Sequence, residues 1–280
     1  MVKLVYNAIK NINKNLIIAK KSNYIFKEKI TIFNTLTSLY FKSVFLPIKS
    51  EVSHVIFGFK VTAYNFGTLL FLFKEIFITK DYFFESDTKT PKIIDCGANI
   101  GMSVLYFKFI FPNCSIIAFE PNPRAFYLLK KNIEQNNLKN IVIYNLALSD
   151  VKGEINFFTG TDDQILLAST IKERGGIHQI KIETELLSTF LTESIDLIKM
   201  DIEGSETKVI KDLVLTQKIS VSKQYIIEYH HKIDNEKSSL SSFLIPFEKT
   251  GFDYNIKTSF LQNGCFQDVL LYVYKDENIH

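Results

Sequence analysis

Cysteine is scarce in this chain, and its three copies lack any spacing typical of a functional site. Cys96, Cys114 and Cys265 are separated by stretches far longer than a C-x-x-C motif. A disulfide framework needs a denser set of cysteines, and a zinc knuckle needs closely spaced pairs. The sequence therefore indicates neither and favours a reducing compartment, so we expect a cytoplasmic protein.

Long apolar runs are also missing. A membrane-spanning helix needs about 18 to 20 consecutive apolar residues, whereas the stretch FGTLLFLF, residues 66–73, is followed by Lys74 and Glu75. The first residues lack an apolar core of the length that signal peptides have. We therefore expect neither a membrane span nor a cleaved leader.

Hydrophobic residues nevertheless make up 46% of the 280 residues and aromatic residues 14%, which is enough for a substantial core in one or two domains. The net charge of +3 is unevenly distributed, because residues 1–50 contain nine lysines and one acid, Glu28. A basic segment suggests an anionic partner such as a membrane surface, although a solvated charged face has the same pattern. We expect no nucleic-acid partner.

The N-terminal segment has the pattern of a basic amphipathic helix, with one apolar and one basic stripe. The apolar stripe is Val2, Val5, Ile9, Ile12 and Leu16, and the basic stripe is Lys3, Lys10, Lys14 and Lys21. This predicts peripheral contact of residues 1–21 with an anionic membrane, or else packing of the apolar stripe on the protein itself. The polar stretch ESDTKTP, residues 85–91, marks a boundary, so we interpret residues 1–90 as this helix and a flanking or lid module.

From Lys92 onward, apolar runs of strand length alternate with helical stretches. The expected strands are KIIDC, SIIAFE, IVIYNLAL, IDLIKMD, YIIEYH, FDYNIK and VLLYVYK. Short strands separated by helices indicate an α/β fold, with a mostly parallel sheet and helices on both faces. The last two runs predict an antiparallel hairpin at the C-terminal edge. We therefore interpret residues 91–280 as one α/β domain.

Two acids stand at strand ends, where open α/β sheets bind their ligands. Asp95 ends the first strand, before the loop GANIG, and Glu120 ends the second. The dinucleotide fingerprint G-x-G-x-x-G is not met, because Asn99 replaces its central glycine, and a nearby carboxylate is unfavourable for a pyrophosphate. A cationic ligand suits this loop better. S-adenosylmethionine carries ammonium and sulfonium groups, and Glu120 is placed to bind its ribose hydroxyls.

Four segments in this order, DCGANIGMSVLYF, AFEPNPRAFYLLKKNI, LALSD and LIKMDIEGSE, resemble the FkbM family of S-adenosylmethionine-dependent methyltransferases. The resemblance implies a class I, Rossmann-like methyltransferase fold with S-adenosylmethionine as cofactor and Glu120 on its ribose. The residues that it implies around the methionine part are Asp95, Gly97, Asn99 and Gly101. Ala147 and Leu148 follow the third strand and are candidates for backbone contacts to adenine, or for ordinary packing.

Further acids follow the fourth strand. Lys199, Asp201 and Glu203 alternate along the chain, so an extended backbone directs them to one side, and Gly204 allows a turn into the next helix. Such carboxylates could position an acceptor hydroxyl, accept its proton or bind a divalent cation. Asp201 is the first candidate for the proton acceptor, and Glu203 is either a second catalytic candidate or a helix-start acid.

The fifth strand ends in QYIIEYHH, which places Glu228 and His230 on one face. His230 is a candidate base or acceptor contact, and the alternative is a structural polar residue. No ligand spacing of the H-x-x-x-H kind accompanies it, so we assign no metal ligands from the sequence, and a need for a divalent metal stays open.

These features predict an enzyme that methylates an oxygen of a sugar or another polyol, with a small-molecule or glycan acceptor. Transfer to oxygen is what the family resemblance implies. Two alternatives stay open. One is a nicotinamide-dependent oxidoreductase, which shares the order of strand, glycine loop and helix, and the other is a non-catalytic module that binds a nucleoside ligand.

Overall fold

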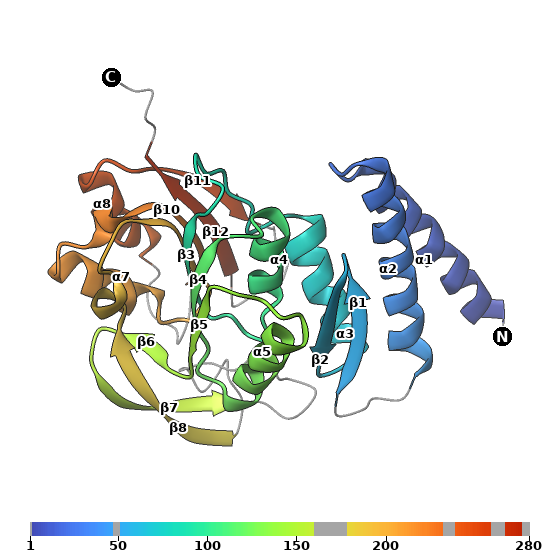
Figure 1. The fold of residues 1–280 in the computed structure, drawn as a ribbon, viewed down its shortest axis with the longest axis horizontal. Helices are drawn as coiled ribbons and strands as arrows, with labels where there is room; N and C mark the ends of the chain where they lie inside the picture. Colours follow the sequence, from blue (N-terminus) through green and yellow to red (C-terminus); the bar gives the residue numbers. More distant parts are fainter. Residues whose placement is uncertain (1, 47–50, 160–177, 232–238, 259–266, 276–280) are drawn as a thin grey trace. The chain divides into compact units, whose positions relative to one another are not determined.

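The computed structural model describes residues 2–46, 51–159, 178–231, 239–258 and 267–275 (Figure 1). The chain forms two compact units, Met1–Phe83 with Lys131–Asn137, and Phe84–Lys130 with Leu138–His280. We name them the N-terminal unit and the larger unit. The predicted domain limits, 1–90 and 91–280, stay a prediction.

The N-terminal unit combines helices with a two-stranded hairpin. Its elements are α1 (Val2–Lys21), α2 (Phe26–Phe45), β1 (Val52–Ile56), β2 (Phe59–Ala63), α3 (Phe66–Leu72) and the π-helix η1 (Phe73–Ile78). The helix expected at the N-terminus is present as α1. The hairpin goes beyond the predicted elements, and its turn is Phe57 and Gly58, with φ angles of 48° and 89°. Two positive φ angles in a row match the right-handed twist of a tight hairpin.

The larger unit is built on a mostly parallel sheet, as predicted. Its strands are β3 (Lys92–Cys96), β4 (Ser115–Phe119), β5 (Ile141–Tyr144), β9 (Ile195–Met200), β10 (Ser222–His231), β11 (Asp253–Thr258) and β12 (Gln267–Tyr274). Within the described residues their order is β11-β12-β10-β9-β3-β4-β5. The five strands from β10 to β5 run parallel, and β12 lies antiparallel to both β10 and β11. The predicted C-terminal antiparallel pair is therefore confirmed.

Helices cover both faces of this sheet. Helices α4 (Met102–Ile110) and α5 (Pro123–Gln135) lie on one side, and α7 (Glu206–Leu215) and α8 (Leu240–Lys249) lie on the other (Figure 1). Short 3₁₀ turns occur at η3 (Leu187–Phe190) and η4 (Ile219–Val221). All six residues of β9 are buried, as expected for a central strand covered on both faces. The α/β fold class is confirmed.

A second, smaller sheet lies in the same unit. It consists of β6 (Ala147–Ser149), β7 (Gly153–Thr159) and β8 (His178–Leu186), in the order β6-β8-β7. The expectation of one strand over IVIYNLAL is wrong, because the chain leaves the main sheet after Tyr144 and pairs with β8 from Ala147. At the break, the side-chain amide of Asn145 donates to the backbone oxygens of Glu120 and Pro121, at 2.7 Å and 3.0 Å. These bonds hold the departing chain against the loop after β4.

Among the residues that the structure describes, no helix has the length and apolar character to cross a membrane.

Candidate functional site

The loop between β3 and α4 follows a left-handed path that glycine favours. Gly97 and Gly101 have φ angles of 82° and 88°, and Asn99 between them has 49°. At Gly97 there is also no room for a side chain, because a Cβ atom would lie 1.8 Å from the backbone oxygen of Asp201. The glycine loop and the acidic loop after β9 are therefore in direct backbone contact.

Asp95 lies beneath this loop, fully buried. Its Oδ2 accepts a hydrogen bond from Ser103 Oγ at 2.5 Å, and its Oδ1 lies 3.3 Å from Lys199 Nζ. Lys199 Nζ also donates to the backbone oxygen of Gly97 at 2.7 Å and lies 3.9 Å from Asp201 Oδ2. Burial by itself lowers the pKa of the Lys199 ammonium, but the carboxylates of Asp95 and Asp201 outweigh it and hold this pKa above its usual value.

A cleft opens at the carboxyl ends of the parallel strands, as expected for this architecture. It encloses about 640 Å³, including space open to solvent. The lining comes from the loops after β3, β4 and β9, from the break between β5 and β6, and from β6 and β7. The residues that line it are Gly97, Asn99, Phe119, Glu120, Pro121, Asn122, Ala125, Leu146, Ala147, Leu148, Phe157, Asp201, Ile202, Glu203 and Ser205.

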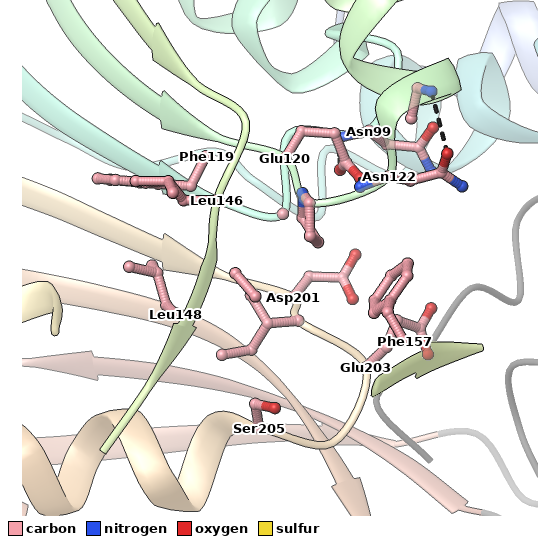
Figure 2. Close-up of a pocket in the computed structure, with 15 residues that line it drawn as sticks. Asn99, Phe119, Glu120, Asn122, Leu146, Leu148, Phe157, Asp201, Glu203 and Ser205 are labelled. Carbon is pink, nitrogen blue, oxygen red and sulfur yellow. Dashed lines mark hydrogen bonds between the residues drawn. The ribbon is translucent and has the colours of Figure 1, made fainter. Parts of the chain in front are cut away.

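The cleft has an apolar side and two polar walls. Phe119, Leu146 and Leu148 lie together on one side, while Asn99, Glu120 and Asn122 gather above the opening (Figure 2). Phe119 is fixed by aromatic neighbours, since its ring stacks on Tyr144 and meets Phe190 edge-on, with centroid distances of 5.4 Å and 4.7 Å. A ligand with a flat apolar part and a polar part fits such a surface.

Glu120 is the best-held acid of the polar walls. Its Oε2 accepts the backbone N–H of Asn99 at 2.8 Å, and its Oε1 accepts the backbone N–H of Asn122 at 2.7 Å. Burial raises the pKa of the Glu120 carboxyl to about 7, although these two N–H groups act in the opposite direction. Each oxygen keeps a further acceptor position, so the carboxylate can bind two neighbouring hydroxyls.

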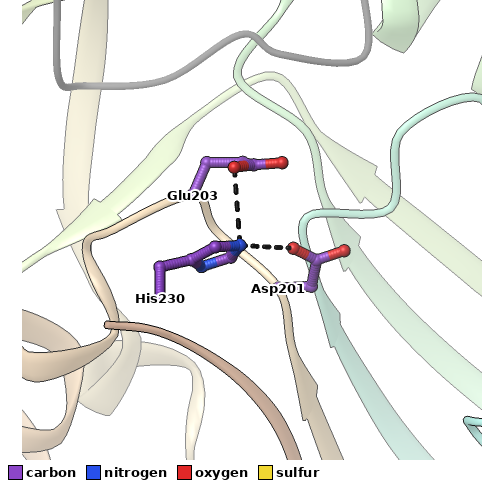
Figure 3. A group of neighbouring side chains, drawn as sticks. All are labelled: Asp201, Glu203 and His230. Atoms are coloured by element: carbon purple, nitrogen blue, oxygen red, sulfur yellow. Dashed lines mark ion pairs between the residues drawn. The ribbon is translucent and has the colours of Figure 1, made fainter. Parts of the chain in front are cut away.

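Two acids, Asp201 and Glu203, lie on the opposite wall, and a buried histidine lies behind them. His230 Nε2 lies 3.9 Å from Asp201 Oδ1 and 3.5 Å from Glu203 Oε2 (Figure 3). β9 and β10 are neighbouring parallel strands, with Ile227 opposite Met200, so the residues after these positions come together. Glu203 reaches the group through a left-handed backbone, with a φ of 55°. The predicted proximity of Asp201 and Glu203 thus arises in a turn and not in an extended strand.

Most of the predicted site residues line the cleft. They are Gly97, Asn99, Glu120, Ala147, Leu148, Asp201 and Glu203. Asp95, Gly101 and His230 lie outside its lining. Asp95 was expected around the ligand, whereas the structure places its carboxylate beneath the loop, because it is the counter-ion that the buried Lys199 ammonium needs. His230 lies behind the wall, where its Nε2 is directed toward the wall residues Asp201 and Glu203.

Some residues of the site were not singled out from the sequence. Asn122 fixes Glu120, Phe157 comes from the small sheet, and Glu206, which is buried, lies with Oε1 2.8 Å from His230 Nδ1. Glu206 opens helix α7 within the segment LIKMDIEGSE, and an acid at a helix start is ordinarily explained by the helix dipole. The contact of Glu206 with His230 becomes evident only when the end of β10 is placed beside the start of α7.

A mostly parallel sheet of this order, with a glycine loop after its first strand, an acid after the second and further acids after the fourth, is the class I methyltransferase fold. The family model described as the methyltransferase FkbM domain matches residues 95–254. Because this range is more than half of the chain, the chain belongs to that family.

Individual relatives are more distant. The chain is 29% identical to methyltransferase 1 of Beauveria bassiana over 168 aligned residues. This alignment covers 51% of this chain and 66% of the relative. It is 30% identical to the 2-O-methyltransferase NoeI of Sinorhizobium fredii over 138 aligned residues. This alignment covers 43% of this chain and 56% of NoeI. The chain thus spans about two thirds of the first relative and little more than half of the second.

Among solved structures, the methyltransferase FkbM of Methylobacillus flagellatus aligns with 96% of this chain and 60% of its own. The TM-score is 0.47 and the identity is 15%.

Proposed function

We propose that this protein uses S-adenosylmethionine to methylate a hydroxyl oxygen of a sugar or another polyol. The observation that carries the proposal is the pair of opposed polar walls, with the Glu120 carboxylate on one and Asp201 with Glu203 on the other. Membership of a methyltransferase family supports the reaction class. The similarity to NoeI, a 2-O-methyltransferase, supports oxygen as the accepting atom.

The residues of the cleft fit this cofactor. Glu120 offers two oxygens to the ribose hydroxyls, and Phe119, Leu146 and Leu148 form a surface for the adenine ring. Ala147 is placed for backbone contact to the same ring, and Gly97 and Asn99 line the wall expected for the methionine part. Carboxylates on both walls disfavour a pyrophosphate and suit a cationic ligand. Asp95 contributes indirectly, by holding the glycine loop through Lys199.

When bound, S-adenosylmethionine supplies a methyl group on a positively charged sulfur, and its transfer to a hydroxyl leaves one proton for the protein to accept. The remaining tasks belong to this chain. It must align the acceptor oxygen, exclude water and accept that proton. Asp201 is our assignment for the proton acceptor, because its Oδ1 faces the histidine and it borders the cleft. Glu203 is assigned to holding the acceptor hydroxyl, and His230, which lies behind the wall, to positioning the two carboxylates.

Binding calorimetry tests the cofactor assignment. S-adenosylmethionine should bind, NADH should not, and Glu120→Ala should weaken S-adenosylmethionine by about 1.5 to 3 kcal/mol, the value of hydrogen bonds to a charged group. Glu154→Ala, which removes an exposed acid of β7, is the matched control and should bind like the wild type. Tight binding of NADH, or an unchanged affinity of Glu120→Ala for S-adenosylmethionine, would refute the assignment.

The role of Asp201 has its own test. Asp201→Asn keeps the shape but removes the proton acceptor, so turnover should fall by about 10²- to 10⁴-fold with cofactor affinity little changed. If Asp201 only balances the charge of Lys199, the variant should lose thermal stability and keep its turnover. The closer partner of Lys199 is Asp95, at 3.3 Å against 3.9 Å, which favours the catalytic role.

A further inference from the structure

The group formed by Asp201, Glu203 and His230 has the composition of a metal site. One potential ligand atom from each residue lies within 4.8 Å of the other two. An imidazole nitrogen with two carboxylate oxygens is a donor set for divalent cations of the first transition row. His230 is 5% exposed, while the side chains of Asp201 and Glu203 are 24% and 23% exposed. The group is therefore anchored on its histidine side and open on its carboxylate side.

A fourth residue orients the histidine. Glu206 Oε1 accepts the backbone N–H of Gly204 at 3.0 Å and that of Ile202 at 3.3 Å, and it lies 2.8 Å from His230 Nδ1. An oxygen with these two donors acts as an acceptor toward Nδ1 as well, which assigns the proton of the neutral ring to Nδ1. The lone pair of Nε2 then points to Asp201 and Glu203. Histidines that bind metals are held by a carboxylate in this way.

The distances are too long for direct hydrogen bonds. The separations of Nε2 from the two carboxylate oxygens, 3.5 Å and 3.9 Å, exceed the range of about 2.7 to 3.2 Å for an N–H···O bond. Bonds of about 2.0 to 2.2 Å to a central ion place neighbouring ligand atoms roughly 3.0 to 3.5 Å apart. The 3.5 Å separation from Glu203 meets this range, and the 3.9 Å separation from Asp201 requires that carboxylate to move closer when the ion binds. The two carboxylate oxygens of Asp201 have different neighbours, since Oδ2 faces Lys199 while Oδ1 faces His230.

We propose that Asp201, Glu203 and His230 bind a divalent transition cation, such as Mn²⁺, whose open coordination positions take two adjacent oxygens of the acceptor. The acceptor part rests on the proposed function and on Asp201 and Glu203 lining the cleft. Three protein ligands leave positions free for substrate, as catalytic metal sites do. An octahedral ion with three protein ligands keeps three free positions, and two adjacent ones suit a vicinal diol, such as neighbouring sugar hydroxyls, better than an isolated hydroxyl.

The cation also resolves a chemical difficulty of the proposed reaction. Carboxylates are weak bases toward alcohols. A hydroxyl bound to a divalent cation releases its proton more readily, as metal-bound water does. The Asp201 oxygen that does not bind the cation, Oδ2, would then accept that proton, and the deprotonated hydroxyl oxygen would form the new bond to the methyl carbon as the bond between that carbon and sulfur breaks.

Titration of the full-length protein with Mn²⁺ tests the site, with free Mn²⁺ followed by electron paramagnetic resonance after removal of metals with EDTA. One saturable site per chain is expected. Glu203→Gln and His230→Gln should weaken binding at least tenfold, and Glu206→Gln should weaken it about 10- to 100-fold. Glu193→Gln, which changes an exposed glutamate, should bind like the wild type. Circular dichroism melts establish that each variant is folded.

The outcomes separate this inference from the proposed function. Absence of saturable Mn²⁺ binding, or equal binding by the wild type and Glu203→Gln, overturns the cation site, even when the metal-free protein binds S-adenosylmethionine and methylates an acceptor. Saturable binding that Glu203→Gln loses supports the site. If S-adenosylmethionine then fails to bind in calorimetry, the proposed function fails while the cation site stands.

Discussion

At the scale of single residues, the contact between Gly97 and Asp201 joins the two walls of the site. The backbone oxygen of Asp201 occupies the place where a side chain at position 97 would begin. The nitrogen of Asp201 also donates to the backbone oxygen of Cys96 at 3.0 Å. The position of the proposed proton acceptor therefore depends on the absence of one Cβ atom in the glycine loop.

Gly97→Ala should destabilise the protein more than the same change at a comparable glycine. Gly251 has a φ of 78° and nothing within 4 Å of an added Cβ, so Gly251→Ala carries only the cost of a left-handed alanine, about 1 to 2 kcal/mol. Gly97→Ala carries the same cost and, in addition, a steric clash of its Cβ with the backbone oxygen of Asp201. Thermal denaturation and calorimetry should show a larger stability loss and weaker cofactor binding for Gly97→Ala only. Equal melting temperatures of the two variants would contradict the close contact.

Glu120 gives the site a dependence on pH. Its pKa of about 7 lies above the ordinary carboxyl value, so the ionised form opposes folding, and the stability that the neutral form contributes is lost as the pH rises through about 7. The ribose needs the ionised form. Cofactor affinity should therefore fall by about tenfold for each pH unit below 7.

Calorimetry of S-adenosylmethionine between pH 5.5 and 8.5 checks this dependence. The cofactor has titrating groups of its own, and their effect on the affinity is the same for the wild type and for Glu120→Gln. The ratio of the two affinities therefore reports the titration of Glu120 alone. The affinity ratio of wild type to Glu120→Gln should rise with pH and level off above about 7. A ratio that is constant over this range would show that Glu120 does not titrate against the cofactor.

Single residues also show where sequence interpretation reaches its limit. Glu120 and Asp201 could be predicted because each directly follows a buried strand, and the ends of parallel strands share one edge of the sheet. The ion pair of Asp95 with Lys199 could not be predicted, since the position of a residue in a strand does not reveal which buried charge lies opposite. The pairing of His230 with Glu206 depends on which strands are neighbours, which the sequence did not define.

At the scale of secondary-structure elements, α1 presents part of its apolar stripe to solvent. Ile9 and Leu16 are 55% and 54% exposed, and Lys10 and Lys14 beside them are exposed as well. The buried residues of α1 in its described part are Asn15 and Ala19. An exposed apolar and basic helix is suited to an anionic membrane surface.

We expect the protein to bind vesicles that contain anionic lipid, in a manner that salt weakens. Lysines near such a surface contribute about 1 kcal/mol each, so Lys10→Gln with Lys14→Gln should lower the affinity roughly 30-fold. Lys60→Gln with Lys89→Gln removes the same charge from exposed positions outside α1. Flotation assays should separate the two double variants, and deletion of residues 1–21 should abolish binding. Equal flotation of all forms would remove the membrane role of α1.

The element scale also shows which patterns are ambiguous. The run IVIYNLAL has strand character throughout, yet Asn145 breaks it through bonds to a distant loop. The strands β7 and β8 flank the segment 160–177, which lies outside the described residues. Their small sheet supplies Phe157 to the cleft, so this part of the site could not be predicted from strand patterns alone.

At the scale of the whole molecule, the fold class followed from one global property, the alternation of buried strands and helices after Lys92. A mistake about one strand does not change the predicted fold class, because each βαβ unit repeats the alternation of strand and helix. The hairpin of the N-terminal unit carries no such repetition. The family match covers residues 95–254, which includes both walls of the cleft, Glu120 and Asp201 among them. The chemistry of the protein is therefore expected from the larger unit.

Transfer of a labelled methyl group tests the central claim most directly. The protein is incubated with S-adenosylmethionine labelled with ¹³C in its methyl group and with sugars and polyols that carry vicinal hydroxyls. Nuclear magnetic resonance of the product then identifies the atom that bears the label. The account predicts a ¹³C methyl ether on one hydroxyl oxygen, formed by the wild type and nearly lost in Asp201→Asn. Label on nitrogen or carbon, or equal transfer by Asp201→Asn, would contradict it.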